Sequence, residues 1–462
     1  MIPERFRPLL DETAWLAEPF AAAGHKLYLV GGVVRDALLD RLGPSPDIDL
    51  TTDARPDEIK RLLGPVADAV WLQGERFGTI GAQKDGRTFE VTTHRAEAYV
   101  PESRKPEVAF ADDVVVDLSR RDFTVNAMAL RLPDLELVDP YGGAADLHDR
   151  RLRTPLSAEE SFSDDPLRML RAARFIAGLH LLPDPAIPKA IAVLRERLEI
   201  VSAERIRDEL DKLVTVELPG EGLRFLVNTG LADHFLPELT GLALEQDPVH
   251  RHKDVLEHTF AVVEKVEETH RIVRLAALFH DIGKPRTRAF GPGGVSFHHH
   301  EVVGARMTRD RMRALRYSNE DVAVVTRLVE LHLRFHGYRD GDGGWTDSAV
   351  RRYVRDAGPL LKELNELTRC DCTTRNVAKA RGLARRMDEL EARIERLEEE
   401  EEVRALRPDI DGQRVMEHLG IAPGPMVGKA LAFLLESRID EGPLGEDEAL
   451  RRLDDWWAEN KT

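Results

Sequence analysis

The sequence predicts an α+β protein, with a small mixed α/β region at the N-terminus and helical regions after it. Two observations support this prediction. Over the first 150 residues, short apolar runs typical of strands alternate with segments of helical spacing. From about residue 155 onward, apolar residues recur at the helical period, so the remaining two-thirds of the sequence is predicted to be mainly helical. A length of 462 residues is enough for about three domains of ordinary size.

In the N-terminal region, each predicted helix and strand rests on its own local pattern. Residues 11–23 have helical spacing. The apolar run Lys26–Val30 predicts a short buried strand, which ends at Gly31-Gly32 and is followed by a helix over Val33–Leu39. Further strand-like runs, separated by loops, are predicted at residues 47–52, 78–83, 88–93 and 113–116. These elements together predict a mixed α/β domain.

The rest of the chain is divided by its helical segments. Helices are predicted at residues 164–178, 186–198, 203–215, 254–268, 272–280, 301–315, 320–334 and 376–403. We expect four parts, an α/β head, a helical neck and body, a third helical domain and a helical acidic tail, over residues 1–150, 151–245, 246–375 and 376–462.

Composition excludes several classes of protein. The formal net charge of −17 at first argues against a polyanionic partner, but residues 388–462 carry −11 of it, so the acidic character lies mostly in the tail. The two cysteines, Cys370 and Cys372, are too few for a disulfide framework and fit a reducing compartment. Neither a signal peptide nor a long apolar run is present, so we expect a cytoplasmic protein without a membrane span.

The first candidate site lies around the predicted Gly-Gly turn. Gly31 and Gly32 leave backbone amides exposed at a helix start, and Arg35 follows, which is typical of a phosphate-binding turn. Asp47 and Asp49 lie on the next predicted strand, whose period of two projects both carboxylates from one face. Such a pair suits two Mg²⁺ ions. The combination predicts metal-assisted nucleotidyl transfer.

Two more segments add candidate residues to this site. Glu90 lies on another predicted strand and is either a third metal-binding carboxylate or an ordinary solvent-facing side chain. The run RRDFTVNAMA over residues 120–129 is rich in groups that bind a triphosphate and a ribose. Within it, Arg121 is the candidate for phosphate, and Asp122 and Asn126 are the candidates for ribose.

Four motifs occur in a fixed order along the sequence. They are Leu29-Val-Gly-Gly-x-x-Arg-Asp, Asp47-x-Asp49, RRDFTVNAMA and Asp164-Asp165-Pro-Leu-Arg168-Met-Leu-Arg171-Ala-Ala-Arg174-Phe. In this order and at these spacings they resemble the bacterial class II tRNA nucleotidyltransferase and poly(A) polymerase family. The likeness extends over nearly the whole sequence and is greatest to actinobacterial-type CCA-adding enzymes with an HD domain.

The resemblance implies a head of the polymerase-β type and an enzyme that adds C, C and A to the 3′ end of tRNA, using CTP, ATP and Mg²⁺ and no nucleic-acid template. It implies that Asp47 and Asp49 carry the metal ions and are catalytic. It further implies that several residues bind the nucleotide. They are Gly31 and Gly32 of the turn, Arg35 on the helix after it, and Arg121 and Asp122 of the RRDFTVNAMA run. The same motifs serve poly(A) polymerases, which therefore remain an alternative.

The fourth motif offers a base-reading pair. On a predicted helix, Asp165 and Arg168 at i, i+3 share a face. A carboxylate accepts from the exocyclic amine of cytosine or adenine, and a guanidinium donates to their ring nitrogen, whereas guanine and uracil mismatch at both positions. Arg171 and Arg174 follow Arg168 at intervals of three residues and are further nucleotide-binding candidates, for the incoming triphosphate or the acceptor end of tRNA. The family motif begins with Glu where this sequence has Asp164, which leaves the role of Asp164 open.

Ten of the 16 histidines lie between residues 250 and 336, where an even spread would place about three. The order His, His-Asp, His, His, Asp resembles the HD superfamily of metal-dependent phosphohydrolases, in which such side chains hold one or two divalent ions. The candidate ligands are His258, His280, Asp281, His300, His332 and Asp371.

Three alternatives stay open for the histidine-rich region and for the protein as a whole. The histidine-rich domain either hydrolyses phosphoesters or only supports tRNA. A different reading makes the protein an HD phosphohydrolase whose head merely binds RNA. The identity of the second metal and the oligomeric state are not predicted.

Overall fold

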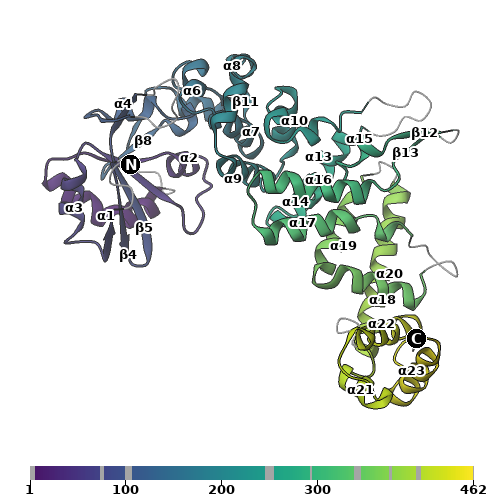
Figure 1. The fold of residues 1–462 in the computed structure, drawn as a ribbon. Helices are drawn as coiled ribbons and strands as arrows, with labels where there is room; N and C mark the ends of the chain where they lie inside the picture. Colours follow the sequence, from purple (N-terminus) through teal and green to yellow (C-terminus); the bar gives the residue numbers. More distant parts are fainter. Residues whose placement is uncertain are drawn as a thin grey trace. The chain divides into compact units, whose positions relative to one another are not determined.

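The computed structural model describes residues 6–72, 78–98, 107–244, 254–291, 294–337, 345–373, 377–401 and 407–460 (Figure 1). The protein forms two compact units, residues 1–237 and 238–462, which are described separately below. The predicted boundary at residues 245–246 lies outside the described residues, and the division into four parts stays a prediction.

A seven-stranded mixed sheet forms the head (Figure 1). Its strand order is β3-β4-β5-β2-β1-β8-β9, in which only the β2 and β5 neighbours are parallel. Every residue of the central strand β1 is buried. The strands span Leu27–Val30 (β1), Ile48–Thr52 (β2), Ala69–Trp71 (β3), Thr79–Lys84 (β4), Arg87–Thr93 (β5), Ala129–Leu132 (β8) and Glu136–Val138 (β9). A separate hairpin pairs Arg95–Ala98 (β6) with Glu107–Phe110 (β7).

The helices of the head are short apart from the first. They are α1 (Arg7–Ala22), α2 (Gly32–Leu38), α3 (Pro56–Leu63), α4 (Val114–Ser119), a 3₁₀ turn (Thr124–Asn126) and α5 (Gly143–His148). The strand predicted at residues 113–116 was wrong, because this segment begins α4. Its valines favour a strand, but the Asp113 carboxylate accepts a hydrogen bond from the Val115 amide and caps a helix instead.

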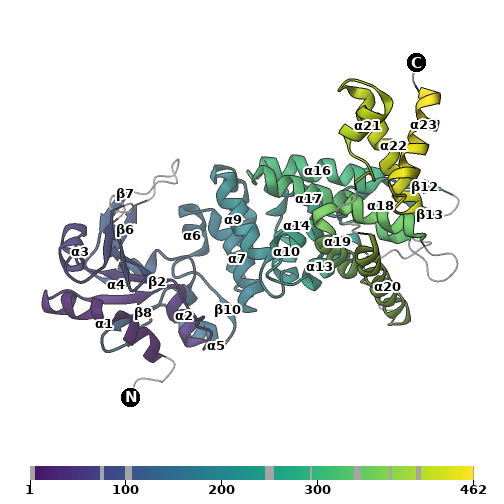
Figure 2. The same ribbon diagram turned by 90° about the horizontal axis from the view of Figure 1, so that it is seen from below.

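Helices with one small parallel strand pair complete the first unit. They are α6 (Ala158–Asp164), α7 (Leu167–Leu179), α8 (Ala186–Leu194), a 3₁₀ helix (Arg195–Ile200), α9 (Ala203–Val214), α10 (Gly220–Asn228) and α11 (Ala232–Phe235), with β10 (Arg151–Leu152) paired to β11 (Leu182–Pro183). Helix α7 packs between α9 and α10 (Figure 2). The continuous helix predicted over 164–178 was wrong at Asp165, which is extended because it precedes Pro166.

The second unit is helical, with one small hairpin formed by β12 (Ala289–Gly291) and β13 (Gly294–Ser296). Its helices are α12 (Pro237–Thr240), α13 (Val255–Lys265), α14 (Arg271–Phe279), α15 (Lys284–Thr287), α16 (His300–Ala314), α17 (Asn319–Leu331), 3₁₀ helices at Arg334–Gly337 and Gly358–Leu360, α18 (Asp347–Ala357), α19 (Leu361–Asp371), α20 (Val377–Glu401), α21 (Gly412–Leu419), α22 (Pro425–Glu441) and α23 (Glu446–Asn460). The helices predicted at 254–268, 272–280, 301–315, 320–334 and 376–403 are confirmed within a few residues. Of the helices in the described ranges, none combines the length and the apolar character that a membrane span needs.

Candidate functional sites

The turn between β1 and α2 brings three predicted site residues together. Gly31 precedes α2 with a φ of 77°, a conformation that glycine adopts without strain. A Cβ atom at this position would lie 3.0 Å from an Nη atom of Arg121 and 3.9 Å from an Oδ atom of Asp49. Because Gly31 has no Cβ atom, it leaves the space in which the Arg121 guanidinium approaches the backbone and the Asp49 carboxylate.

Asp47, directly before strand β2, and Asp49, on this strand, project their carboxylates from one face, as the sequence predicts. Asp47 and Asp49 are exposed, whereas Ile48 and Leu50 between and after them are buried. Glu90 on β5 is the register partner of Asp49.

Burial and neighbouring negative charge raise the pKa of two of these carboxylates, Asp49 and Glu90. Partial burial and the negative charge of Asp47 raise the pKa of Asp49 against the opposing charge of Arg121. Burial, Asp49 and Asp47 likewise raise the pKa of Glu90. Carboxylate oxygens are the ligands that a hard divalent cation prefers, but this trio is not one of the compact ligand groups found among the described residues, so Mg²⁺ binding here stays a prediction.

Arg121 has donor capacity left for an anion. One of its Nη atoms lies 3.2 Å from the Asp117 carboxylate, and its Nε is buried without a hydrogen-bond partner among the described residues. A buried N–H without a partner costs stability unless a ligand satisfies it. Both Arg121 and the carboxylates Asp49 and Glu90 line the same cavity of about 280 Å³. A phosphate group in this cavity would pair with Arg121 beside the candidate metal ligands.

A series of polar contacts leads from Arg35 to Arg171. Arg35 donates to the Asn126 side-chain oxygen at 2.7 Å, and the Asn126 amide donates to the Asp122 carboxylate at 2.9 Å. The other Asp122 oxygen accepts from Arg171 at 2.7 Å. Burial alone would raise the pKa of Asp122, but Arg171 and the Asn126 hydrogen bond lower it to about 2. Asp122 is therefore ionised at neutral pH and holds the side chains on either side of it.

Glu209 on α9 is a site residue that sequence reasoning missed. Its carboxylate is buried and lies 2.8 Å from Nε of Arg174 and 3.5 Å from an Nη atom of Arg171. Three guanidiniums surround one aromatic ring. Those of Arg35, Arg171 and Arg174 lie 5.4, 5.6 and 4.3 Å from the centroid of the Phe175 ring. A signal existed in the sequence, since Glu209 falls at helical spacing among the buried residues Ile206, Leu210 and Leu213.

The structure corrects the placement of the base-reading pair. Asp165 is not on the helix that carries Arg168, so the prediction of one shared helix face was wrong. The Asp165 carboxylate instead accepts from Arg205 at 2.7 Å. The Arg168 guanidinium is buried and donates to the Ser161 hydroxyl at 3.0 Å and to the Arg120 carbonyl. Each member of the pair is thus fixed by its own partners.

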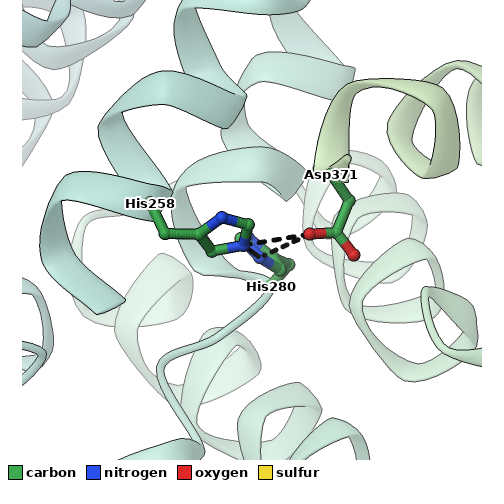
Figure 3. A group of neighbouring side chains, drawn as sticks. All are labelled: His258, His280 and Asp371. Carbon is green, nitrogen blue, oxygen red and sulfur yellow. Dashed lines mark hydrogen bonds and ion pairs between the residues drawn. The ribbon is translucent and has the colours of Figure 1, made fainter. Parts of the chain in front are cut away.

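The predicted ligands of the second unit gather in two adjoining groups. In the first group, which Figure 3 shows, Nε2 of His258 lies 3.0 Å from the Asp371 carboxylate and 3.3 Å from Nε2 of His280. In the second group, Nε2 of His300 lies 3.4 Å and Nε2 of His332 lies 4.0 Å from one oxygen of Asp281. Within each group the ligand atoms all lie within 4.8 Å of one another.

Asp281 connects the two groups. Its Oδ1 faces His300 and His332, while its Oδ2 lies 3.1 Å from Nε2 of His280 and accepts from Lys284 at 2.6 Å. Burial would raise the pKa of Asp281, but the charges of His280 and Lys284 hold it well below its usual range. This carboxylate is therefore anionic and suited to bridge two cations.

The imidazoles are oriented for metal binding by hydrogen bonds on their outer side. Nδ1 of His280, His300 and His332 each faces a backbone carbonyl at 2.6 to 2.8 Å, and Nδ1 of His258 faces the Thr373 hydroxyl at 2.6 Å. In a neutral imidazole, an Nδ1–H bonded in this way leaves Nε2 as a lone-pair donor. Although burial opposes it, the charges of Asp281 and Asp371 raise the pKa of His280, so this ring must lose its second proton when it binds a metal ion. Nε2 of His300 and of His332 is buried and has no hydrogen-bond partner among the described residues. Burial and the charge of His280 lower the pKa of His332 to about 3, which keeps it neutral.

Three family models match the sequence in succession. They are the poly A polymerase head domain over residues 27–153, the probable RNA and SrmB-binding site of polymerase A over 183–242, and the HD domain over 254–396. Among curated relatives, the A-adding tRNA nucleotidyltransferase of Deinococcus radiodurans is 35% identical, over 93% of this chain and 95% of that protein. The CCA-adding enzyme of Streptococcus thermophilus is 31% identical, over 97% of this chain and 96% of that protein.

Solved structures establish the likeness of fold. The Bacillus stearothermophilus CCA-adding enzyme in complex with CTP has a TM-score of 0.68 at 24% identity, over 100% of this chain and 99% of that one. The Thermotoga maritima CCA-adding enzyme complexed with tRNA has a TM-score of 0.61 at 18% identity, over 99% of this chain and 96% of that one. A mixed-sheet head with paired carboxylates beside an arginine-bearing cavity, joined to helical domains, defines a nucleotidyltransferase. The chain belongs to the tRNA nucleotidyltransferase family, as its full-length relatives show.

Proposed function

We propose that this protein adds C, C and A to the 3′ end of tRNA from CTP and ATP without a nucleic-acid template. The observation that carries the proposal is the meeting of Asp49, Arg121 and the Gly31 backbone, because it sets candidate metal ligands beside a candidate phosphate ligand. Full-length similarity to an A-adding and to a CCA-adding enzyme supports a tRNA substrate.

The residues of the head divide the work of the reaction. Asp47 and Asp49, with Glu90 as a third carboxylate, would hold Mg²⁺. When bound, the ions lower the pKa of the tRNA 3′-hydroxyl and stabilise the departing pyrophosphate. Arg121 binds the triphosphate through its free Nε–H, and Arg35 supports this position from the Asn126 side. Asp122, held ionised, accepts from a ribose hydroxyl or holds Asn126 and Arg171 in place for it.

Asp165 and Arg168 supply the choice of base. A carboxylate acceptor beside a guanidinium donor matches the amine and ring nitrogen of cytosine and adenine. Both groups are fixed by protein partners, which supports a rigid template rather than a mobile pair. A base with the opposite pattern would leave two polar groups unpaired, at about 1–3 kcal/mol each.

The experiment that tests this function uses tRNA ending at three points: before CCA, after the first C and after the second C. Each substrate is incubated with one labelled nucleoside triphosphate at a time, and products are resolved at single-nucleotide length. We expect two CMP and one AMP on the shortest substrate. Addition of AMP only to tRNA already ending in CC would identify an A-adding enzyme, and long A tails without C would identify a poly(A) polymerase. Asp47→Asn with Asp49→Asn is the inactive control.

We propose phosphoester hydrolysis as a second activity, at the histidine-rich groups of the second unit. The Nε2 atoms of His300 and His332 lie beside the anionic Asp281 and have no hydrogen-bond partner in the described part of the chain, which supports a centre with two divalent cations. Such a centre activates water for attack on phosphorus, and a 2′,3′-cyclic phosphate at a damaged tRNA end is a substrate of the matching class.

Metal binding and hydrolysis test this activity separately from nucleotide addition. Titration calorimetry with Mn²⁺, Ni²⁺ and Zn²⁺ should give up to two sites, which His280→Ala with Asp281→Ala removes. The control variant is His270→Ala, since His270 pairs with Glu366 away from the groups. Hydrolysis of 2′,3′-cyclic AMP should follow metal content and persist in the Asp47→Asn, Asp49→Asn variant. Unchanged metal binding in the His280, Asp281 variant would contradict the assignment.

A further inference from the structure

A groove between α16 and α17 of the second unit carries cations that the proposed chemistry leaves unused. The two helices pack side by side (Figure 1), and the groove has a volume of about 540 Å³. Its lining residues are Arg309, Arg313, Asn319, Val322, Ala323, Thr326, Arg327 and Glu330. Three arginines therefore face one carboxylate.

The groove has more positive than negative side chains in its lining. Glu330 accepts from Arg327 at 2.6 Å, which satisfies the acidic residue of the lining. Arg327 is further held by the Asp356 carbonyl at 2.7 Å. Arg309 and Arg313 are exposed and have neither an ion pair nor a hydrogen bond to another residue in the part of the protein that the structure describes. They lie one helical turn apart, where like charges repel each other.

A buried hydroxyl adds a second, independent observation. Thr326 also lines the groove, its side chain is more than nine-tenths buried, and its Oγ1 has no hydrogen-bond partner among the described residues. Threonine in a helix usually donates to the carbonyl four residues earlier. A hydroxyl left free beside two unpaired guanidiniums is a donor set for an anionic oxygen.

We propose that the α16–α17 groove binds backbone phosphates of the tRNA substrate, with Arg309 and Arg313 as the phosphate ligands and Thr326 as an additional donor. This inference rests on the proposed function, which supplies the polyanionic partner. Charge complementarity favours RNA, because unpaired arginines on an otherwise acidic protein match a phosphate backbone. Contacts of this kind strengthen binding without selecting a base.

The test compares tRNA binding by wild type, Arg309→Glu with Arg313→Glu, and a control with the same change of charge elsewhere. Arg381→Glu with Arg407→Glu is the control, since both arginines are exposed and lie outside the groove. Fluorescence anisotropy measures the Kd of tRNA lacking CCA between 50 and 200 mM salt. Loss of two phosphate contacts should lower the slope of log K against log salt by about 1.8. The affinity lost over this fourfold salt range should then be about twelvefold smaller than in wild type.

Kinetics separate the groove from the catalytic head. The groove variant should raise the KM for tRNA at least tenfold and leave the KM for CTP unchanged. The milder Arg309→Ala, Arg313→Ala variant should shift Kd in the same direction, which keeps the test valid if charge reversal disturbs folding. A groove variant with the Kd and salt slope of the control would overturn the inference while leaving nucleotide addition intact. If wild type bound no tRNA, both the inference and the proposed function would fall.

Discussion

Replacing Asp122 with asparagine removes a buried charge while nearly preserving shape. In the native head this carboxylate accepts from the Asn126 amide and from Arg171, and its pKa is lowered from the ordinary value of 3.8 to about 2. At 1.36 kcal/mol per pH unit, that difference contributes about 2 kcal/mol to stability at neutral pH. Because the native pKa is the lower one, the contribution is complete well above pH 3.8 and is lost as pH falls through about 2.

We therefore expect Asp122→Asn to lower the free energy of unfolding of the first unit by about 2 kcal/mol at pH 7 and by only about 1 kcal/mol at pH 3. Urea unfolding read by hydrogen exchange and mass spectrometry follows residues 6–237 separately from the second unit. Asp57→Asn is the control, because Asp57 is exposed and its ion pair within the described ranges is with Lys60, a contact worth at most about 1 kcal/mol. A penalty that is the same at pH 7 and pH 3 would refute the assignment of a strongly lowered pKa.

Three further predictions concern the head and neck. Gly31→Ala should raise the KM for nucleoside triphosphate at least tenfold. Gly24→Ala is the control and should not raise it, because Gly24 has a similar positive φ but no atom lies within 4 Å of the new Cβ. Equal effects of the two changes would mean that backbone strain alone is responsible. Arg168→Ala should let UTP and GTP compete with CTP, by about five- to a hundredfold in relative kcat/KM, and retained selectivity would contradict the base-reading role. Glu209→Gln should lower the melting temperature and the rate of nucleotide addition together, since it leaves Arg171 and Arg174 without their shared carboxylate, while Glu209→Asp should restore part of both.

Several strands of the head could be predicted from local sequence patterns. The apolar run before Gly31 predicted β1, and the alternation around Asp47 and Asp49 predicted both β2 and the direction of its carboxylates. These patterns succeed because period and burial are properties of a single strand. The order of histidines and aspartates was also visible, although no local pattern states that His258 and Asp371, far apart in the sequence, lie 3.0 Å apart.

Other elements depend on contacts that a local pattern does not contain. Ala129–Leu132 is a strand because it pairs with β1, yet it is a short segment that begins at the last residue of the RRDFTVNAMA run and was not predicted as a strand. The valines after Asp113 were assigned to a strand, and one hydrogen bond to that side chain was enough to favour a helix. Glu209 is explained only by the two arginines of α7 that it faces. Tertiary partners decide such cases.

The positions of Asp165 and Arg168 limit how this pair can contact a base. Pro166 was visible in the sequence and should have ended the helix before it, so Asp165 and Arg168 cannot act as neighbours on one helical face. A guanidinium has five N–H groups. Contacts with the Ser161 hydroxyl, the Ser161 carbonyl at 3.4 Å and the Arg120 carbonyl use three of those on Arg168, and the other two have no hydrogen-bond partner among the described residues and could donate to a base. The contact with Arg120 also joins this guanidinium to the residue before Arg121, so a base held by Arg168 would be positioned relative to the phosphate ligand by the protein itself.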